Sequence, residues 1–232
     1  MKKPKIAIVG YGQFERFMAK HLRPYAIIVP IKRNTDPKKV SACDVVIFSV
    51  SWCGLEPVTA RLKPFIGPET LLIDVMSVKQ KPLAFLKKQF PEHQILGTHP
   101  IFGPQSGKNG IKGLPIVLCN ESFTTANYQK VKKFLKKTLE LKVIEESAKD
   151  HDTQMANIQG LTHFIGRALL SLDIKSYVTN TQSYNHLLEL KSLLKNDSWE
   201  LFTTIQNTNP EAKVVRGSFL KELQELEEKL QG

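Results

Sequence analysis

The feature that most constrains this chain is a short apolar run at residues 5–9, Lys-Ile-Ala-Ile-Val, which ends at the glycine pair Gly10 and Gly12. A short run of this kind is typical of a strand that is buried on both faces of a parallel sheet. Apolar residues then recur with helical spacing from Phe14 to Leu22. The start of the chain therefore predicts a strand, a tight turn and a helix.

The same alternation of strand and helix continues along the chain. Helices are predicted at 55–65 and 127–139, and the segment before residue 44 is so short that one crossover is expected to be trimmed to a turn. Strands that alternate with helices favour an α/β fold with a Rossmann-like, mostly parallel sheet. The further strands are predicted at residues 26–31, 44–50, 70–75, 94–98, 116–118 and 142–144.

The character of the sequence changes near residue 148. Glycine, proline and strand-like runs become rare, and helices are predicted at 148–171, 183–206 and 210–230. We therefore expect two domains, a sheet domain at residues 1–147 and a small all-helical C-terminal domain at residues 148–232. A helical domain this small cannot bury all its apolar faces alone, so we expect it to dock on the sheet domain or to form a homodimer.

The chain is strongly basic, with a formal net charge of +11. Such a charge suits nucleic acid, an anionic membrane surface or small anionic ligands. The lysines are dispersed, mostly as pairs beside predicted amphipathic helices, and aromatic residues do not interleave with them as a base-stacking platform requires. Small anionic ligands are therefore favoured, and nucleic acid is not expected.

The sequence favours a cytoplasmic protein. No apolar run approaches the roughly 18 residues of a membrane span. The first apolar run lacks the length and the cleavage site of a signal peptide. Cys43, Cys53 and Cys119 are odd in number and lack metal-ligand spacing, which suits a reducing compartment and no metal site.

The turn at Gly10 and Gly12 matches the first two glycines of a dinucleotide-binding motif, because it follows a strand and precedes a helix. The first glycine permits the tight turn, and the second lets a pyrophosphate approach the N–H groups of the helix N-terminus. An ordinary tight turn is the alternative. The predicted cofactor site comprises Gly10, Gly12, Gln13, Phe14, Ser49 and Val50.

Two departures from the motif bear on the cofactor. Glu15 stands where the third glycine is expected, and its carboxylate falls near the bound phosphates. No acidic residue follows the second strand to bind the 2′-hydroxyl of NAD, and Lys32 and Arg33 occupy that region instead. Cations there suit the 2′-phosphate, so the prediction is NADP, with NAD as the alternative.

A second functional region surrounds His99. The segment 98–110, Thr-His-Pro-Ile-Phe-Gly-Pro-Gln-Ser-Gly-Lys-Asn-Gly, follows a predicted strand, and Ser77 lies at the end of another. The carboxyl ends of strands in an open α/β sheet face the ligand crevice, so both groups should lie on the side of the glycine turn. From the residues alone, His99 could equally be a hydrogen-bonded structural histidine.

These motifs resemble the prephenate and arogenate dehydrogenases of tyrosine biosynthesis, most closely the plant-type arogenate dehydrogenases. The resemblance implies an oxidative decarboxylation that converts arogenate to tyrosine, or prephenate to 4-hydroxyphenylpyruvate. Hydride leaves ring carbon C4 for the nicotinamide, the C4 hydroxyl loses its proton, and the ring carboxylate leaves as carbon dioxide. The matching segments are 10–14, 74–79, 98–110, 151–152, 161–163, 166–167 and 196–198.

The resemblance also implies roles for residues in both domains. His99 is the base that takes the hydroxyl proton, and Ser77 positions that hydroxyl. Gln159 and His163, four residues apart on a predicted helix, bind substrate. Without the resemblance, His163 reads as a buried helix histidine. The run 150–152, Asp-His-Asp, does not predict a metal site, because consecutive helical residues cannot all face one ion.

Three more residues are assigned to the substrate. Lys108 and Arg167 are candidates to hold a substrate carboxylate, and the sequence does not choose between them. Asp197 matches a position where an acidic residue favours arogenate, whose side chain carries an ammonium group. Capping of the helix that begins near Trp199 is the alternative role for Asp197.

The sequence also leaves open a second class of function, a binding protein without efficient catalysis. Because Glu15 replaces a motif glycine, the chain could be a catalytically impaired relative that binds a dinucleotide or metabolite as a regulator.

Overall fold

The computed structural model describes residues 2–232. Contacts within the chain divide it into two compact units, Met1–His151 and Asp152–Gly232. The division falls four residues after the boundary expected from the sequence, inside a helix. The two units are described separately below.

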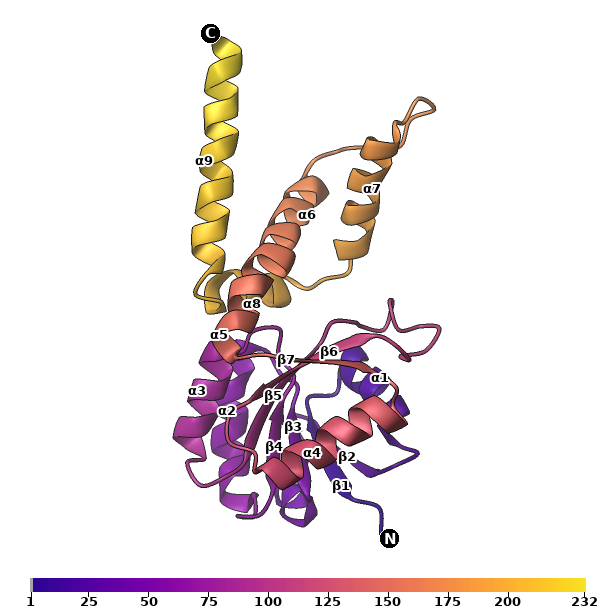
Figure 1. Ribbon diagram of the computed structural model, residues 1–232, viewed down its shortest axis with the longest axis vertical. Helices are drawn as coiled ribbons and strands as arrows, with labels where there is room; N and C mark the ends of the chain where they lie inside the picture. The colour runs from indigo at the N-terminus through magenta and orange to yellow at the C-terminus, as the bar shows by residue number, and fades with distance from the viewer. Residues whose placement is uncertain (1) are drawn as a thin grey trace. The chain divides into compact units, whose positions relative to one another are not determined.

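The first unit contains a seven-stranded sheet with the order β2-β1-β3-β4-β5-β6-β7. Every neighbouring pair is parallel except β5 and β6, which are antiparallel. The mostly parallel, Rossmann-like sheet expected from the sequence is therefore confirmed (Figure 1). The strands are β1 (Lys5–Val9), β2 (Ile27–Ile31), β3 (Val45–Phe48), β4 (Leu71–Asp74), β5 (Ile95–Pro100), β6 (Pro115–Asn120) and β7 (Lys142–Glu145).

Helices cover both faces of the sheet (Figure 1). Helices α2 (Trp52–Leu62) and α3 (Gln80–Gln89) pack on one face. Helix α1 (Gln13–Leu22) and helix α4 (Thr125–Lys133), which continues into the π-turn η3 (Phe134–Thr138), pack on the other. The crossover from β2 to β3 is the short 3₁₀ helix η1 (Pro37–Ala42), as its length predicted, and a second 3₁₀ turn, η2 (Lys63–Phe65), follows α2.

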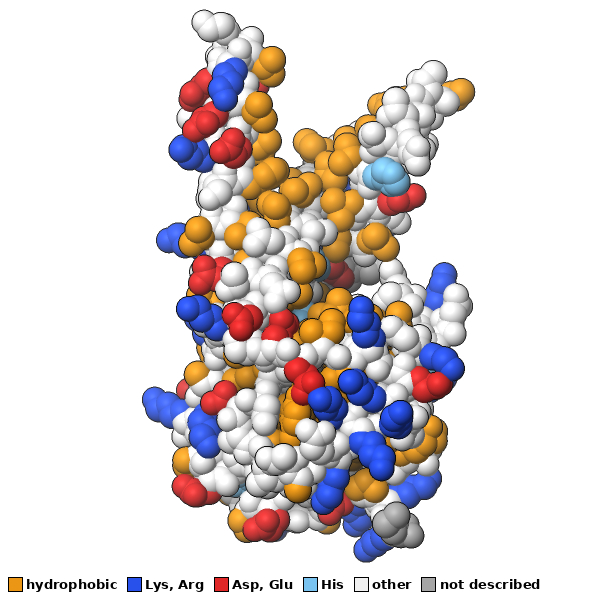
Figure 2. Space-filling view, viewed as in Figure 1, with side chains coloured by type: hydrophobic (Ala, Val, Ile, Leu, Met, Phe, Trp, Pro, Cys, Tyr) orange, Lys and Arg blue, Asp and Glu red, His pale blue; other side chains and the backbone are white. Residues whose placement is uncertain are grey.

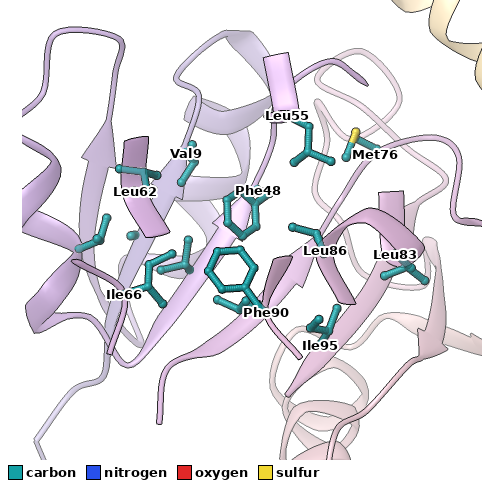
Figure 3. Close-up of a cluster of buried hydrophobic side chains, with 14 of the residues drawn as sticks. Val9, Phe48, Leu55, Leu62, Ile66, Met76, Leu83, Leu86, Phe90 and Ile95 are labelled. Atoms are coloured by element: carbon teal, nitrogen blue, oxygen red, sulfur yellow. The ribbon is translucent and has the colours of Figure 1, made fainter. Parts of the chain in front are cut away.

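The core beneath α2 and α3 follows from the alternation of side chains along the strands. Phe48 of β3 and Phe90, which ends α3, lie at its centre with ring centroids 6.3 Å apart. Toward this face, strands β3, β4 and β5 present only apolar residues and Gly97 until their carboxyl ends, where Asp74 and His99 replace them. Figure 3 shows the two phenylalanines surrounded by Leu55, Leu62, Leu83 and Leu86.

Two expectations from the sequence need correction. Helix α3 was not expected, because prolines and lysines around Pro82 obscured its apolar face. The single helix expected at 183–206 is wrong: α7 (Gln182–Leu194) ends before α8 (Trp199–Thr208) begins. Ser198 causes that new start, since its hydroxyl accepts a hydrogen bond from the N–H of Leu201.

The second unit is all helical. Its chain leaves α5 (Ala148–Met155), passes through a π-turn η4 (Ala156–Leu161), and continues as α6 (Thr162–Ser171), α7, α8 and α9 (Ala212–Gln231). Polar side chains support the π-turn, because Gln206 Nε2 donates to the carbonyl of Gly160 at 2.7 Å and Asn209 Nδ2 donates to that of Asp152 at 2.7 Å. Both side chains are buried.

Among residues 2–232, no helix is long and apolar enough to span a bilayer.

A buried ion pair fixes the end of β4 against β5. Lys79 Nζ donates to a carboxylate oxygen of Asp74 and, at 2.8 Å, to the carbonyl oxygen of Thr98. Neither charged side chain is exposed. The hydroxyl of Thr98 donates back to the Asp74 carbonyl at 3.0 Å. The two strands are therefore joined by side chains as well as by the sheet ladder.

Breaking this pair should cost more stability than removing both of its charges. We expect Lys79→Met to lower the free energy of unfolding by about 3–5 kcal/mol, because it leaves the Asp74 carboxylate buried without a cation. Adding Asp74→Asn should recover part of that loss. Urea unfolding measures both variants, with Lys88→Met as a control on an exposed lysine of the same helix. Equal losses in Lys79→Met and Lys88→Met would show that the pair contributes nothing.

Candidate active site

The glycine turn after β1 lies where the strand order reverses. Strand β1 pairs with β2 on one side and with β3 on the other, so its carboxyl end is the switch point of the sheet. Gly10 has a φ of +91°, and a Cβ placed there would lie 2.1 Å from the carbonyl oxygen of Ser49. Only glycine fits this position, so the tight turn anticipated from the sequence is a requirement of the fold.

Helix α1 begins directly after the turn. Gly12 is its N-cap and supplies no side chain to the first N–H groups. Gln13 is exposed, whereas the ring of Phe14 lies among apolar side chains on the sheet side of the helix. The uncapped N–H groups and the helix dipole suit an anion such as a phosphate.

The carboxylate of Glu15 lies beside this helix N-terminus. Its Oε1 accepts a hydrogen bond from the Ser49 hydroxyl at 2.7 Å, and its Oε2 lies 2.8 Å from where a Cβ of Gly12 would stand. Val50 follows Ser49 and lies against Gly10. The structure thus gathers the predicted cofactor residues Gly10, Gly12, Ser49 and Val50 at one point, together with a carboxylate.

Lys32 and Arg33 follow β2 with exposed side chains. Arg61 of α2 holds the backbone of this loop, since its guanidinium donates to the carbonyls of Lys32 at 3.1 Å, Arg33 at 2.7 Å and Thr35 at 3.0 Å. Lys32 Nζ lies 5.4 Å from the centre of the Tyr11 ring, in the glycine turn. The loop is therefore ordered and basic beside the cofactor turn.

His99 lies at the carboxyl end of β5, on the α2–α3 face, and is 5% exposed. Its Nδ1 is 2.9 Å from Nε2 of His151, in α5. Burial, with the neighbouring His151 and Lys79, holds the pKa of His99 well below its ordinary value of 6.5. His99 is consequently a neutral imidazole at neutral pH.

The contact with His151 determines what His99 can do. In a hydrogen bond between two imidazole nitrogens, one nitrogen donates and the other accepts. If His99 Nδ1 carries the hydrogen and donates to His151, then Nε2 of His99 bears a lone pair and can accept a proton. No hydrogen bond to that Nε2 occurs within residues 2–232.

The ion pair beneath His99 is part of the same buried group. Burial raises the pKa of Asp74, and the Lys79 ammonium opposes that rise. Because Lys79 also binds the carbonyl of Thr98, the residue before His99, the pair fixes the backbone that carries the imidazole. Asp150 lies apart from this group, since its backbone and carboxylate both bond to Ser147.

Ser77 and the loop 101–114 complete this end of the sheet. Ser77 is half-buried after β4, and within the described residues its hydroxyl makes no hydrogen bond, to His99 or otherwise. Gly107 packs so closely on Phe17 of α1 that a Cβ would lie 2.4 Å from the ring. Lys108, next to Gly107, is exposed.

The helical unit holds a second polar group around His163. Its Nδ1 lies 3.5 Å from Oδ2 of Asp197, and both side chains are largely buried. Burial lowers the pKa of His163, and the Asp197 carboxylate partly offsets this shift. Burial raises the pKa of Asp197, and the neighbouring His163 and Arg167 partly offset that rise. The carboxylate of Asp197 is not a helix cap, because Ser198 caps α8.

Arg167 is held by aromatic rings. Its guanidinium carbon lies 5.6 Å from the ring centre of Trp199 and 5.3 Å from that of Phe202, and it donates to the Asp197 carbonyl at 2.9 Å. The fixed guanidinium plane suits a carboxylate better than the exposed Lys108 does.

Gln159 lies in the π-turn before His163. Its Oε1 is buried without a hydrogen-bond partner among the described residues. A buried acceptor without a partner is costly, and π-turns are frequent at functional sites. Gln159 is therefore a candidate ligand-binding residue.

The sequence did not predict that Asp74, Lys79 and His151 form a buried polar group with His99. Asp74 and Lys79 entered the sequence analysis only within the segment 74–79, and His151 only within the run 150–152, for which no metal site was predicted. All three residues lie in segments that carry the family resemblance, as His99 does, and this was the signal that could have identified them. Among residues 2–232, no group of three or more His, Cys, Asp or Glu side chains is placed to hold a metal ion.

Comparison with known proteins identifies the family. A family model described as "Prephenate dehydrogenase, nucleotide-binding domain" matches residues 8–144, and one described as "TYRAAT1-like, C-terminal domain" matches residues 168–232. The first model alone spans more than half of the chain.

Curated relatives agree with that match. "Arogenate dehydrogenase 2, chloroplastic" of Arabidopsis thaliana is 34% identical, over 90% of this chain and 64% of the relative. "Arogenate dehydrogenase 1, chloroplastic" of the same plant is 30% identical, over 90% of this chain and 36% of the relative. The chain therefore spans less than two thirds of the length of these relatives.

Solved structures share the fold. Prephenate dehydrogenase from A. aeolicus, in complex with hydroxyphenyl propionate and NAD+, has a TM-score of 0.77 at 19% identity, covering 99% of this chain and 91% of that one. Synechocystis arogenate dehydrogenase has a TM-score of 0.69 at 18% identity, covering 98% and 91%. With the family model, this likeness means that the chain belongs to the prephenate dehydrogenase family.

Proposed function

We propose that this chain catalyses the NADP-dependent oxidative decarboxylation of arogenate, or of prephenate, with His99 as the base. The observation that carries the proposal is a buried, neutral His99 at the carboxyl end of β5, hydrogen-bonded to His151 through Nδ1. The names of the Arabidopsis relatives and of the A. aeolicus and Synechocystis structures support the same reaction.

The cofactor fits the glycine turn on structural grounds. The backbone at Gly10 leaves no room for a side chain, and the N-terminus of α1 has no side-chain cap. A bound nicotinamide would accept the hydride from ring carbon C4. The extended dinucleotide would then follow the carboxyl edge of the sheet from the β2 side to the β5 side, where His99 lies.

The protein's own residues handle the proton. His99 Nε2 takes the proton of the C4 hydroxyl while Nδ1 donates to His151, and the hydroxyl oxygen becomes a carbonyl oxygen. The bond from the ring to its carboxylate then breaks, and its electron pair enters the ring, which becomes aromatic with a phenolic oxygen. The proton on His99 can return to that oxygen. The hydroxyl of Ser77 is proposed to position the substrate hydroxyl.

Lys32 and Arg33 support NADP over NAD. Both are exposed at the end of β2 on a loop held by Arg61, and acidic side chains are absent from residues 32–35. A 2′-phosphate carries up to two charges and suits paired cations. Glu15 opposes phosphate binding nearby, where its carboxylate accepts a hydrogen bond from the Ser49 hydroxyl.

The impaired, binding-only alternative is less favoured. It was motivated by Glu15 alone, whereas His99, His151 and the ion pair of Asp74 and Lys79 form a complete proton-accepting group. The curated relatives are also named as dehydrogenases rather than as binding proteins.

In the helical unit, we propose that Gln159, His163, Asp197 and Arg167 bind substrate. Arg167 supplies a fixed guanidinium for a carboxylate, and Lys108 in the other unit is the second candidate. Asp197 supplies a carboxylate for the ammonium of arogenate, a group that prephenate lacks. Arogenate is therefore the proposed preferred substrate.

We also propose a homodimer through the helical unit. The first residues of α9 pack against other helices, where Arg216 donates to Gln206 and Ala212 lies against Gly160. Figure 2 shows hydrophobic side chains along one side of the rest of α9 and charged ones along the other. Leu220, Leu223 and Leu226 are 49%, 47% and 55% exposed, which suits burial against a second copy.

Sedimentation of the wild type and of Leu223→Glu tests the dimer. Charge on the apolar stripe should convert a dimer to monomer, whereas Glu228→Lys, an exposed position that helical spacing places on the opposite side of α9, should leave it dimeric. A monomeric wild type would contradict the proposal.

The cytoplasmic location stays a prediction from the sequence, although the two Arabidopsis relatives are named as chloroplastic.

The role of His99 is tested by turnover. We expect His99→Ala to lower kcat by at least about a hundredfold, the usual scale for a lost general base. His186→Ala, on an exposed histidine of α7, should leave kcat near that of wild type. Near-normal turnover of His99→Ala would remove His99 from the mechanism.

The pH profile adds an independent readout. The base must be unprotonated to act, and its pKa lies well below 6.5, so kcat/KM should stay level from neutral pH down to 6.5 and fall only below it. An acidic limb centred above 6.5 would mean that another group is the base.

Cofactor choice is tested by charge removal. Lys32→Ala with Arg33→Ala should raise KM for NADP at least about tenfold, the loss of roughly 1.4 kcal/mol of phosphate binding, while KM for NAD changes little. Lys38→Ala with Lys39→Ala removes the same charge nearby and should leave both constants unchanged. An equal effect of the first pair on NAD and NADP would argue against a 2′-phosphate site.

Substrate choice is tested at Asp197. Asp197→Asn keeps the shape of the side chain and removes its charge, so kcat/KM for arogenate should fall at least about tenfold relative to that for prephenate, as loss of a partly buried ion pair implies. Asp173→Asn, on an exposed carboxylate of the same unit, is the control. An unchanged ratio would show that Asp197 does not bind the ammonium group.

A further inference from the structure

The sheet face that carries α1 and α4 is too wide for two helices. Strands lie about 4.8 Å apart, so seven of them span roughly 29 Å from first to last. A helix with its side chains is about 10 Å wide, and about three are needed to cover that span. In the described sheet unit this face carries α1 and α4 with its π-turn, and the loop residues Phe102 and Ile111 also pack on it.

An apolar pocket of about 180 Å³, partly open to solvent, lies between α1 and the π-turn after α4. Phe14 and Phe17 of α1 line one side, Phe134 after α4 lines the other, and Ile47 and Ile73 of the sheet form the floor. Ile73 is only half-buried although β4 is a central strand.

The lining allows only an uncharged ligand. Its polar side chains are Thr98 and His21, and the Thr98 hydroxyl is already bonded to the Asp74 carbonyl. Burial and the neighbouring Lys20 lower the pKa of His21, so its imidazole is neutral at neutral pH. Bringing a carboxylate or an ammonium group into such a cavity would cost several kcal/mol.

The volume sets the size of the ligand. Apolar cavities of about 150 Å³ stay free of water and bind benzene. We propose that this cavity is a second binding site, which takes a small uncharged aromatic molecule of one ring. The site lies behind the catalytic strand, since Thr98 and Pro100 of β5 line it while His99, between them, points to the opposite face.

Benzene and xenon are suitable probes, because both enter dry apolar cavities. Benzene should raise the urea midpoint of the wild-type chain, and the effect should saturate with benzene concentration. Crystals under xenon pressure should show xenon beside Phe17 and Ile73. A wild type without xenon at this position, or without a benzene-dependent midpoint, would overturn the proposal.

A cavity-filling variant locates the effect. Ile73→Phe places a ring in the cavity and should abolish the benzene effect, whereas Ile144→Phe makes the same change at an exposed position of β7 and should retain it. An equal benzene effect in both variants would place benzene elsewhere and overturn the assignment. Should Ile73→Phe fail to fold, the xenon measurement on the wild type decides alone.

Discussion

The buried ion pair between Asp74 and Lys79 joins the carboxyl end of β4 to β5, the strand that carries His99. Neither side chain reaches solvent, and Lys79 also binds the carbonyl that precedes His99. A buried pair of this kind gives little net stability, but either charge alone is costly, so each partner requires the other. The pair thereby fixes where β4 ends relative to β5, and with it the place from which His99 meets His151.

The proposed function assigns two tasks to the carboxyl edge of the sheet. The turn at Gly10 and the cations Lys32 and Arg33 lie toward β2, while His99 lies at β5, with β3 and β4 between them. An extended dinucleotide matches that separation. Glu15 lies in the first turn of α1, where its carboxylate accepts a hydrogen bond from Ser49. Cofactor affinity is therefore the property that Glu15 should influence most.

Much of the fold could be predicted from local patterns. Apolar runs and the turn at Gly10 identify the strands, because buried strands and positive φ angles restrict residue type. Long-range pairs could not be predicted: the contact of His99 with His151 joins residues 52 positions apart. Helix α3 was missed because Pro82 and the lysines of this segment conceal its apolar face, and the pocket over Ile73 corresponds to no sequence motif.

The most direct measurement is the reduction of NADP and of NAD by the purified chain, with arogenate and with prephenate. The account predicts that NADPH and carbon dioxide form in equal amounts from arogenate, faster than with NAD and faster than from prephenate. Cofactor binding without turnover of either substrate would contradict it, and would leave the chain as a binding protein built on a dehydrogenase fold.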